Sequence, residues 1–492
     1  GTAKSWHAYS ACRQEECRSR DTPLPSGIAA TGDQSRSGGN ALFLTMITKS
    51  NTFFADIKSD LAFLERDYVG GVATVDRTRQ HSLVAYPEGG YGWVVVLGAF
   101  LVFHAGFGLV LSFGIWNIYY QSTFPIHKVL FVDKPPQWII SIGALQLAVL
   151  NLSGLVAGRL VNRVSARASL IVGSSFIVYS LFCVSLSEQL WEFYLSHSIL
   201  LGTGIGLCYN PALYAVTQWF RQKRALAVGI SFCGAYLGGV TWPVIFYYAY
   251  KKLDFPMANR TYTHIKLPLT LGIIAIIVAV ELFIATFLVK ERIPKSSQKV
   301  GKWDFTAFKD NRFVFMCLGN LVSSFGFWVA PFFTVWWLRL NGVTTAYLTI
   351  CLMNAASIPG NLLAGYLADR YGNLNVLTST TFLTGLVNIC FWLPNKTIDS
   401  VFFFSILYGF LSGGYFSLYA VSMKRIAVGK GFAAQLGMFN FSATLGVLFG
   451  TPVAILLNWD LAFALSGAAM IIGSLFIAKV RWSLNRTLFA KV

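Results

Sequence analysis

Apolar positions along the chain gather in long runs that charged residues rarely interrupt. A hydrocarbon core about 30 Å thick takes about 20 helical residues to cross, and from residue 92 onward such runs follow one another. We therefore predict an all-α integral membrane protein with twelve transmembrane helices in two six-helix halves. The predicted segments are 92–119, 138–157, 168–187, 191–218, 225–250, 266–289, 313–338, 343–366, 374–394, 399–422, 431–457 and 460–480.

The stretches outside these runs are polar. Residues 1–86 are rich in Ser, Arg and Asp without sustained periodicity, which predicts a disordered tail. A charged stretch, 290–312, separates the first six runs from the last six, and a short basic tail, 483–492, ends the chain. The predicted domains are therefore two six-helix bundles, 87–289 and 313–482, with a linker between them.

Composition excludes the common soluble classes. Of the 492 residues, 55% are hydrophobic and 12% are charged, whereas a soluble domain carries roughly 25% charged residues. A soluble protein of this length would form about three domains with charged surfaces, for which the chain has too little charge. An ordinary soluble enzyme, a disulfide scaffold and a disordered chain are all excluded.

The net charge of +18 would suggest a nucleic-acid partner in a soluble domain. Here the Lys and Arg residues lie between apolar runs, which indicates the positive-inside bias of a membrane protein and no nucleic-acid partner. The even-numbered connections carry about twice as many of them as the odd-numbered ones, so we expect even connections and both termini on the cytoplasmic side. Glycosylation sequons at Asn259 and Asn395 fall in odd connections, on the expected outer side.

The eight cysteines predict no cofactor and no metal site. Six of them lie inside apolar runs, and none has the spacing of zinc ligands or of a disulfide framework. We expect packed, free thiols.

One short motif occurs twice. Gly158-Arg-Leu-Val-Asn-Arg follows the second segment, and Gly365-Tyr-Leu-Ala-Asp-Arg follows the eighth. Such an internal repeat predicts two related halves. A Gly lets two helices approach closely, and an acidic residue at a helix end can bind an Arg or a helix N-terminus. The motif is thus a candidate latch between conformations, with a basic membrane-anchoring loop as the alternative. The latch residues are Gly158, Arg159, Asn162, Arg163, Gly365, Asp369 and Arg370.

At these residues the chain resembles the major facilitator superfamily, whose signature between helices 2 and 3 is Gly-x-Leu-x-Asp-Arg-x-Gly. The second copy matches, with Asp369 and Gly372 at the acid and the last Gly. The first copy departs, with Asn162 in place of the acid and Ser165 in place of the last Gly.

Two further segments resemble the monocarboxylate porter family, in its fungal style. Pro87-Glu-Gly-Gly-Tyr-Gly-Trp93 is similar to the family's opening of helix 1, and Trp219-Phe-Arg-Gln-Lys-Arg-Ala-Leu-Ala-Val-Gly229 is similar to its opening of helix 5. The resemblance covers about residues 86–482. Arg221 and Arg224 lie at the cytoplasmic boundary of helix 5, where gating and lipid-headgroup contact are both open.

The resemblance implies a substrate cavity near the bilayer midplane, lined by helices 1, 4, 5, 7, 8, 10 and 11. Five proline residues in these helices are expected at cavity walls or helix seams: Pro211, Pro243, Pro331, Pro359 and Pro452. Each polar residue in them is a substrate candidate or, equally, an interhelical hydrogen bond. The candidates are His104, Asn117, Tyr209, Asn210, Asn320, Asn354, Asn361, Tyr415 and Asn440.

Two ionisable residues in the spans need separate interpretation. His104 is the ionisable side chain well inside helix 1, and histidine changes charge near neutral pH, so it is a candidate for proton coupling. Glu281 lies in helix 6, which the resemblance treats as a scaffold helix. We expect Glu281 to be paired near the cytoplasmic side rather than to carry a proton.

The chain lacks three charges of the proton-coupled lactate carriers. Those carriers have a Lys in helix 1 and an Asp/Arg pair in helix 8, where this chain has Leu111, Ser357 and Asn361. A carboxylate in a dry cavity needs a charged partner or several donors. A neutral or larger substrate, such as a vitamin or a secondary metabolite, fits this chain at least as well.

The combined prediction is a secondary transporter that moves a small organic solute by alternating access. Its expected partners are the lipid bilayer and the solute, with protons as candidate coupling ions. The family resemblance implies the plasma membrane. The alternative is a non-transporting nutrient sensor with the same fold. A membrane enzyme lacks support because no catalytic set appears on shared helices.

Overall fold

The computed structural model describes residues 86–121, 135–252, 266–292, 305–343, 345–394, 396–427 and 432–487. The predicted N-terminal tail, most of the 290–312 linker and the sequon residues Asn259 and Asn395 lie outside these ranges. Within them the chain forms helices and turns but no strand. Twelve helical spans are long and apolar enough to cross a membrane, so the predicted fold class is confirmed.

The first half contains six spans. Span 1 comprises α2 (Tyr91–Ala105), α3 (Phe107–Leu111) and α4 (Phe113–Gln121); spans 2 and 3 are α5 (Pro136–Arg163) and α6 (Ala166–Leu186); span 4 comprises α7 (Leu190–Phe193), the π-helix η2 (Tyr194–Leu200) and α8 (Leu201–Trp219); spans 5 and 6 are α9 (Arg224–Lys252) and α10 (Lys266–Leu288).

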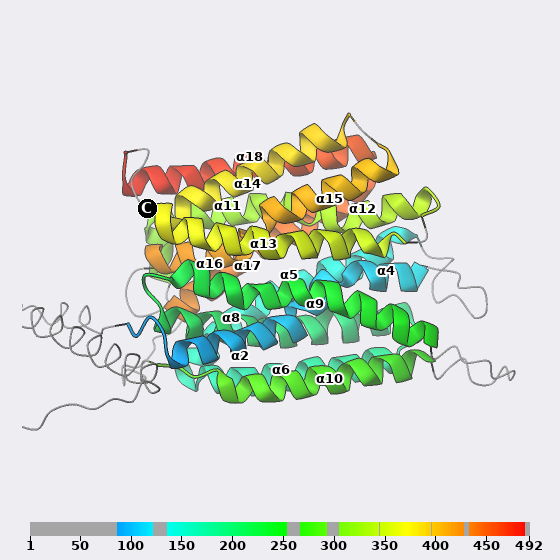
Figure 1. The fold of residues 1–492 in the computed structure, drawn as a ribbon, viewed down its shortest axis with the longest axis horizontal. Helices are drawn as coiled ribbons and strands as arrows, with labels where there is room; N and C mark the ends of the chain where they lie inside the picture. The colour runs from blue at the N-terminus through cyan, green and yellow to red at the C-terminus, as the bar shows by residue number, and fades with distance from the viewer. Residues whose placement is uncertain are drawn as a thin grey trace, which may run out of the picture. The chain divides into compact units, whose positions relative to one another are not determined.

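The second half begins with a short 3₁₀-helix, η4 (Phe305–Lys309), and also contains six spans. Span 7 comprises α11 (Asn311–Phe327) and α12 (Val329–Leu340); spans 8 and 9 are α13 (Tyr347–Tyr371) and α14 (Asn373–Trp392); span 10 comprises α15 (Ile398–Ser412) and α16 (Tyr415–Ile426); spans 11 and 12 are α17 (Phe432–Leu456) and α18 (Trp459–Leu484). Figure 1 shows α2–α10 in its lower part and α11–α18 in its upper part.

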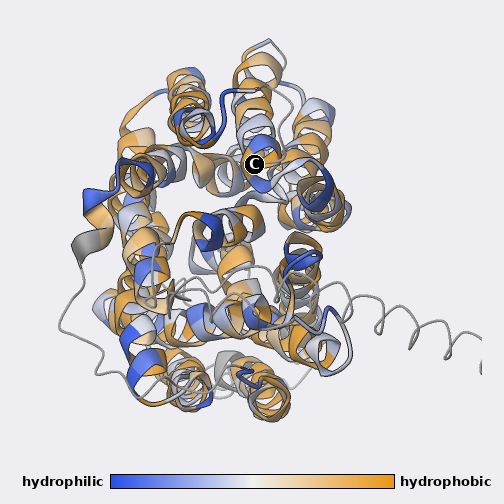
Figure 2. Cartoon of the chain, turned by 90° about the vertical axis from the view of Figure 1, so that its left-hand side faces the viewer, coloured by the Kyte–Doolittle hydropathy of each residue, from blue (hydrophilic) through white to orange (hydrophobic). Residues whose placement is uncertain are grey.

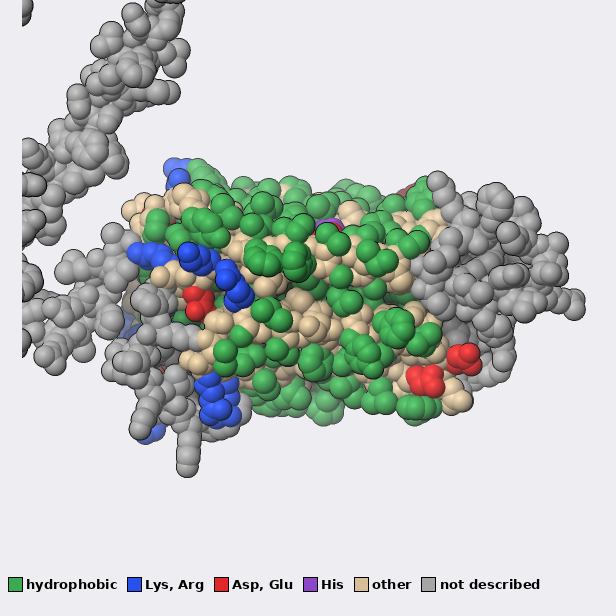
Figure 3. All heavy atoms as spheres, turned by 90° about the horizontal axis from the view of Figure 1, so that it is seen from below, with side chains coloured by type: hydrophobic (Ala, Val, Ile, Leu, Met, Phe, Trp, Pro, Cys, Tyr) green, Lys and Arg blue, Asp and Glu red, His purple; other side chains and the backbone are tan. Residues whose placement is uncertain are grey.

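The helices run alongside one another, and their outer surface is apolar. Figure 2 looks down the helices and shows most of their residues to be hydrophobic. The face in Figure 3 is covered by hydrophobic side chains, while Lys and Arg gather at one end. We call this the basic end; Arg163, Arg221, Arg224 and Arg370 lie at the ends of helices there. An apolar belt with a basic end is what a bilayer-spanning bundle requires.

The repeated motif lies on helices and not in loops, which corrects the sequence-based placement. Helix α5 continues to Arg163 and α13 to Tyr371, so each copy forms the last turns of its helix. Gly372 ends α13 with a φ of 106°, a left-handed conformation that favours glycine. Ser165 in the first copy has extended backbone, and its side chain accepts a hydrogen bond from Ala168 N to start α6. The two copies therefore end their helices by different means.

The two halves meet along two pairs of long helices. Helix α5 packs against α17, and α9 packs against α13. Small residues permit the approach: a Cβ placed on Gly437 would lie 2.5 Å from the carbonyl oxygen of Gly154. These two seams surround the space between the halves.

Four of the five prolines named from the sequence lie inside continuous helices, whereas Pro331 lies in the first turn of α12, three residues after the break at Trp328. Pro211, Pro243, Pro359 and Pro452 lie inside α8, α9, α13 and α17, which continue through them. The breaks occur in spans 1, 7 and 10, at Gly106 and Ser112, at Trp328, and at Gly413 and Gly414. Neighbouring helices re-satisfy backbone groups beside a membrane proline, so proline alone does not locate a break.

Candidate functional site

A small cavity lies between the two halves near the broken helices. Its volume is about 30 Å³. Its wall combines aromatic rings with a few carboxamides and hydroxyls, and none of its lining residues is charged. The polar lining residues other than tyrosine are Asn151, Asn320, Ser324 and Asn440; the aromatic ones are Phe107, Tyr209, Trp328, Tyr415, Phe416, Tyr419 and Phe439.

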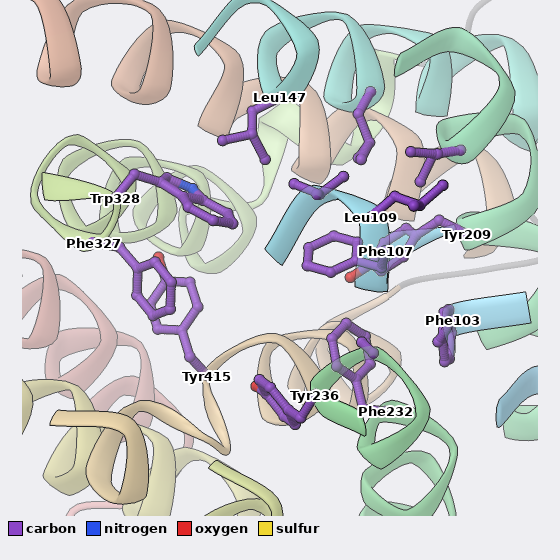
Figure 4. Packing of buried hydrophobic residues seen from close by; sticks show 14 of the residues in the cluster. Phe103, Phe107, Leu109, Leu147, Tyr209, Phe232, Tyr236, Phe327, Trp328 and Tyr415 are labelled. Carbon is purple, nitrogen blue, oxygen red and sulfur yellow. The ribbon is translucent and has the colours of Figure 1, made fainter. Parts of the chain in front are cut away.

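Aromatic rings from both halves fill the centre of this site. Figure 4 shows Phe107 and Tyr209 on one side and Trp328 and Tyr415 on the other. Phe107 stacks on Tyr209 with ring centroids 5.6 Å apart, and its edge meets Phe416 of the other half at 5.1 Å. Ligand pockets typically have volumes of about 300–1,000 Å³. The cavity is therefore collapsed in this conformation, and a metabolite needs the halves to separate.

The polar side chains of the wall are partly engaged with one another. Asn320 donates to the Phe439 carbonyl and to Ser442 Oγ, both at 3.2 Å. Asn440 donates to Asn210 Oδ1 at 2.6 Å and so joins α17 to α8 across the halves. The Nδ2 atom of Asn210 is buried without a partner. A buried donor of this kind is free to bind water or a ligand.

The structure separates the predicted substrate residues into three groups. Tyr209, Asn320, Tyr415 and Asn440 line the cavity. Asn354 and Asn361 instead donate to backbone carbonyls of α9, at Gly239 (3.4 Å) and Gly229 (2.7 Å), and so join α13 to α9. Asn210, His104 and Asn117 do not line the cavity; Asn117 is buried at 5% exposure in α4. Asn151, Ser324 and Trp328 also line it, and the sequence did not single them out.

His104 is paired with Glu281. Its Nδ1 lies 2.9 Å from Glu281 Oε2 on α10, and its Nε2 lies 2.9 Å from Thr241 Oγ1 on α9. Glu281 was expected to be paired near the cytoplasmic side, and the structure supplies His104 as the partner. His104 is the middle residue of the span Tyr91–Asn117, so the pair lies in the interior of the bundle.

At the basic end, Asp369 connects the two halves. Its carboxylate accepts hydrogen bonds from the backbone N–H groups of Ala225 and Leu226, both at 2.9 Å, at the first turn of α9. Gly365, one turn earlier, lets α13 approach: its Cβ would lie 3.0 Å from the Ala225 carbonyl. A carboxylate at a helix N-terminus compensates the helix dipole and the unpaired N–H groups. This is the arrangement that the latch hypothesis describes.

The first copy of the motif makes a different contact. A Cβ on Gly158 would overlap the carbonyl oxygen of Ala433 at the start of α17. Asn162 makes no side-chain hydrogen bond within the described ranges. Arg159 and Arg163 lie on the same last turns of α5. A carboxylate thus joins α13 to α9 at the basic end. Helices α5 and α17 are instead held there by the close approach of their backbones at Gly158 and Ala433.

Glu88 brings the two signature segments together. Its carboxylate accepts hydrogen bonds from the backbone N–H groups of Arg221 (2.7 Å), Gln222 (2.7 Å) and Lys223 (3.2 Å). The ring of Trp93 lies 4.9 Å from that of Phe220 in the same region. Arg221 therefore takes part through its backbone N–H group. The side chain of Arg224 donates from Nε to the Phe220 carbonyl at 2.9 Å. The side chain of Arg370 lies over the ring of Tyr371, at 5.4 Å from its centroid.

The halves also touch at the opposite end. The ring of Phe113 meets that of Phe332 at 5.5 Å, and Tyr247 stacks on Tyr347 at 5.1 Å. Gly114 allows Ile350 to contact α4 directly. With contacts at both ends and a collapsed cavity between them, the structure represents a closed conformation.

Comparison with known proteins agrees with this architecture. The family model described as Major Facilitator Superfamily matches residues 136–356 and 316–487. The solved structure of the E. coli fucose:proton symporter has a TM-score of 0.59 and 12% identity, and the match covers 79% of this chain and 98% of that chain. The chain belongs to the Major Facilitator Superfamily.

Curated relatives of the chain are transporters. The agnestins efflux protein AgnL12 of Paecilomyces divaricatus is 29% identical over 81% of this chain and 89% of its own length. The riboflavin transporter MCH5 of Saccharomyces cerevisiae is 30% identical over 75% of this chain and 73% of its own length. The aspyridones efflux protein apdF of Emericella nidulans is 30% identical over 75% and 72%. The chain is accordingly a multi-pass membrane transporter.

Proposed function

We propose that this transporter moves an uncharged, planar organic metabolite by alternating access of the two halves around the central cavity. The observation that carries the proposal is the cavity wall, which offers aromatic faces and carboxamides but no charged side chain. Aromatic faces bind planar rings, and carboxamides supply both donors and acceptors. A relative named as a riboflavin transporter is consistent with this class.

The positions that carry charge in lactate carriers support the same conclusion. Ser357 donates to the carbonyls of Met353 (2.8 Å) and Gly409 (3.0 Å), so its hydroxyl joins α13 to α15. Asn361 donates to Gly229 O and accepts from Ser417 Oγ at 2.7 Å. Both groups serve helix packing, and a carboxylate in the cavity would lack a cationic partner. Within the superfamily we place the chain in the fungal monocarboxylate-porter-like family, because its two signature segments, joined by Glu88, form one contact region.

We propose that the basic end faces the cytoplasm, following the bias of Lys and Arg, and that the plasma membrane is the location. The halves 87–289 and 313–482 would rock about the seams α5/α17 and α9/α13. The latch is the pair of contacts made by Asp369 and Gly158. The proposal assigns no enzymatic activity, no cofactor and no nucleic-acid partner. The cavity between the halves favours transport over a non-transporting sensor.

The test is uptake by proteoliposomes of labelled riboflavin and, in parallel, labelled pyruvate. We expect riboflavin flux and no protein-dependent pyruvate flux. Replacing Trp328 with alanine removes an aromatic wall worth about 0.5–1.5 kcal/mol per ring pair, so riboflavin flux at limiting concentration should fall about 2- to 10-fold. Tyr179→Ala is the matched control, because Tyr179 is 60% exposed on α6, away from the cavity. Pyruvate flux without riboflavin flux would overturn the proposed substrate class.

A further inference from the structure

Three buried aromatic side chains donate hydrogen bonds to backbone carbonyls at the helix breaks of spans 1, 7 and 10. Each of these carbonyls lies at its break or within two residues of it. The pairs are Trp242 Nε1 with the His104 carbonyl (2.8 Å), Tyr408 Oη with the Phe327 carbonyl (2.7 Å) and Tyr236 Oη with the Gly413 carbonyl (2.5 Å). A side chain from a second helix therefore binds each of the three breaks.

The breaks deprive these carbonyls of their ordinary helical partner. A helical carbonyl accepts the N–H of the residue four positions later. For Phe327 that residue is Pro331, which has no N–H. Within the described ranges, the backbone hydrogen bonds around the breaks of spans 1 and 10 do not include the His104 or the Gly413 carbonyl. Because an unpaired backbone group is unfavourable inside a membrane, the aromatic donor supplies what each break removes.

One of the three bonds differs from the others because it joins the two halves. The bond at span 1 comes from span 5, in the first half, and the bond at span 7 comes from span 10, in the second half. Tyr236 lies on α9 in the first half, whereas Gly413 lies at the break of span 10 in the second half. When the halves move as bodies, the first two bonds move with them. The bond between Tyr236 and Gly413 is the one that has to break.

Tyr236 holds the part of span 10 that lines the cavity, although it does not line the cavity itself. Gly413 lies two residues before α16, whose first residues, Tyr415 and Phe416, are in the cavity wall. One turn earlier on α9, the ring of Phe232 stacks on that of Phe416, with centroids 5.7 Å apart. Figure 4 shows Tyr236 beside Phe232. Helix α9 therefore contacts span 10 on both sides of its break.

Separation of the halves leaves both groups of this bond without their partner. The Tyr236 side chain is buried, so water does not compete for the Gly413 carbonyl in the closed conformation. After opening, water or a ligand can reach both groups. If the hydroxyl were removed, closure would bury an unpaired carbonyl, which disfavours the closed conformation about 5- to 160-fold. The hydroxyl therefore favours closure over opening.

We propose that Tyr236 is a positioning residue for closure of the transporter. Its hydroxyl binds the Gly413 carbonyl when the halves close around the cavity and releases it when they separate. The bonds at the breaks of spans 1 and 7 stay intact throughout the cycle. This inference rests on the alternating access of the proposed function but not on its substrate class, so it can be tested without any substrate.

The first experiment is double electron–electron resonance on the full chain in lipid nanodiscs, in a background without native cysteines. Spin labels in place of Val164 and Tyr371 measure the separation of the halves at the basic end, and labels in place of Leu186 and Leu456 measure it at the opposite end. All four side chains are exposed at helix ends. Tyr236→Phe removes only the hydroxyl. We expect the ratio of long- to short-distance populations to rise about 5- to 160-fold at one of the two ends.

Tyr408→Phe is the matched control. It removes the same atom from the same kind of bond, but both partners of that bond belong to the second half. We expect it to lower the temperature of thermal unfolding about as much as Tyr236→Phe does, while both distance distributions stay as in the wild type. Distances unchanged by Tyr236→Phe would overturn the proposal. Equal shifts in the two variants would also overturn it, because any lost hydroxyl would then loosen the bundle.

The second experiment keeps the bond, so that it does not depend on the folding of Tyr236→Phe. Incorporation of 3-fluorotyrosine at position 236 makes the hydroxyl a stronger donor and adds little volume. In weakly acidic buffer this hydroxyl stays protonated. The fluorinated protein should hold the closed conformation at least as well as the wild type, so the long-distance population should not increase. An increase would contradict the proposal.

These measurements separate the role of Tyr236 from the proposed substrate class. Distances shifted by Tyr236→Phe, in a protein without riboflavin flux, would retain the role of Tyr236 and reject the substrate class. Riboflavin flux in the wild type, with distances that Tyr236→Phe leaves unchanged, would retain the substrate class and reject the role of Tyr236.

Discussion

Replacing Gly158 with valine should slow transport at least about fivefold while leaving each half folded. A Cβ at this position overlaps the carbonyl oxygen of Ala433, so α5 and α17 cannot reach their present separation at the basic end. Overpacking of this kind is unfavourable by about 1–3 kcal/mol, which disfavours closure of that end about 5- to 160-fold. The protein should accumulate with its basic end open, and riboflavin flux should fall by a similar factor.

The matched control for this variant is Gly272→Val. No atom lies within 4 Å of a Cβ built on Gly272, so the same substitution there should leave flux unchanged. Both variants add the same side chain to a transmembrane helix. Equal flux in Gly158→Val and Gly272→Val would show that the α5/α17 seam does not close during transport.

Native cysteines allow the open end to be identified. Cys233 contacts the Ile358 carbonyl near the middle of the α9/α13 seam, nine residues from the basic end of α9. Cys351 contacts the Val240 carbonyl and lies four residues from the opposite end of α13. Both thiols are buried, at 7% and 8% exposure. Opening of the basic end should expose Cys233 to a membrane-impermeant maleimide and leave Cys351 protected. Gly158→Val should therefore label faster at Cys233.

The helices could be predicted from the sequence because each apolar run is long enough to cross a bilayer on its own. The two halves followed from the repeat at Gly158 and Gly365. Most breaks could not be predicted, since span 1 breaks at Gly106 and span 10 at Gly413, whereas most of the prolines lie in continuous helices. Pro331, beside the break at Trp328 in span 7, is the exception. Neighbouring helices supply hydrogen-bond partners for the backbone groups that a proline leaves unpaired. The sequence does not show which helices these are.

The cavity was predicted in part. Tyr209, Asn320 and Tyr415 line it, but Asn354 and Asn361 bond to α9. Whether an Asn faces the cavity or a neighbouring helix depends on the rotation of its helix about the helix axis. A helix that is apolar on all sides has no sequence pattern from which this rotation can be predicted. Phe107 was missed because a cavity aromatic and a core aromatic have the same sequence context. Glu88 was recognised as part of a motif, but its contact with Arg221 joins segments far apart in the chain.

Replacing Asp369 with asparagine should open the basic end without any steric change. The carboxylate now accepts two backbone N–H groups from the first turn of α9, and its charge compensates the helix dipole. Asparagine keeps one acceptor oxygen but removes the charge, a loss of up to about 2 kcal/mol in a partly buried site. The equilibrium should shift toward the open form by up to about 30-fold, with Cys233 labelling accelerated accordingly.

Asn162 occupies the position in the first copy of the motif that Asp369 occupies in the second, so substitutions at the two positions compare the two seams. The first copy already carries the amide in place of the acid, so Asn162→Asp tests whether a carboxylate there would add a second latch. Because closure at that seam rests on the proximity of Gly158 to Ala433, we expect Asn162→Asp to change Cys233 labelling much less than Asp369→Asn does. Asp399→Asn, which removes an exposed charge outside both seams, should leave labelling unchanged. Unaltered labelling in Asp369→Asn would mean that the carboxylate is not a latch, and that the seam is held by packing of α13 on α9 alone.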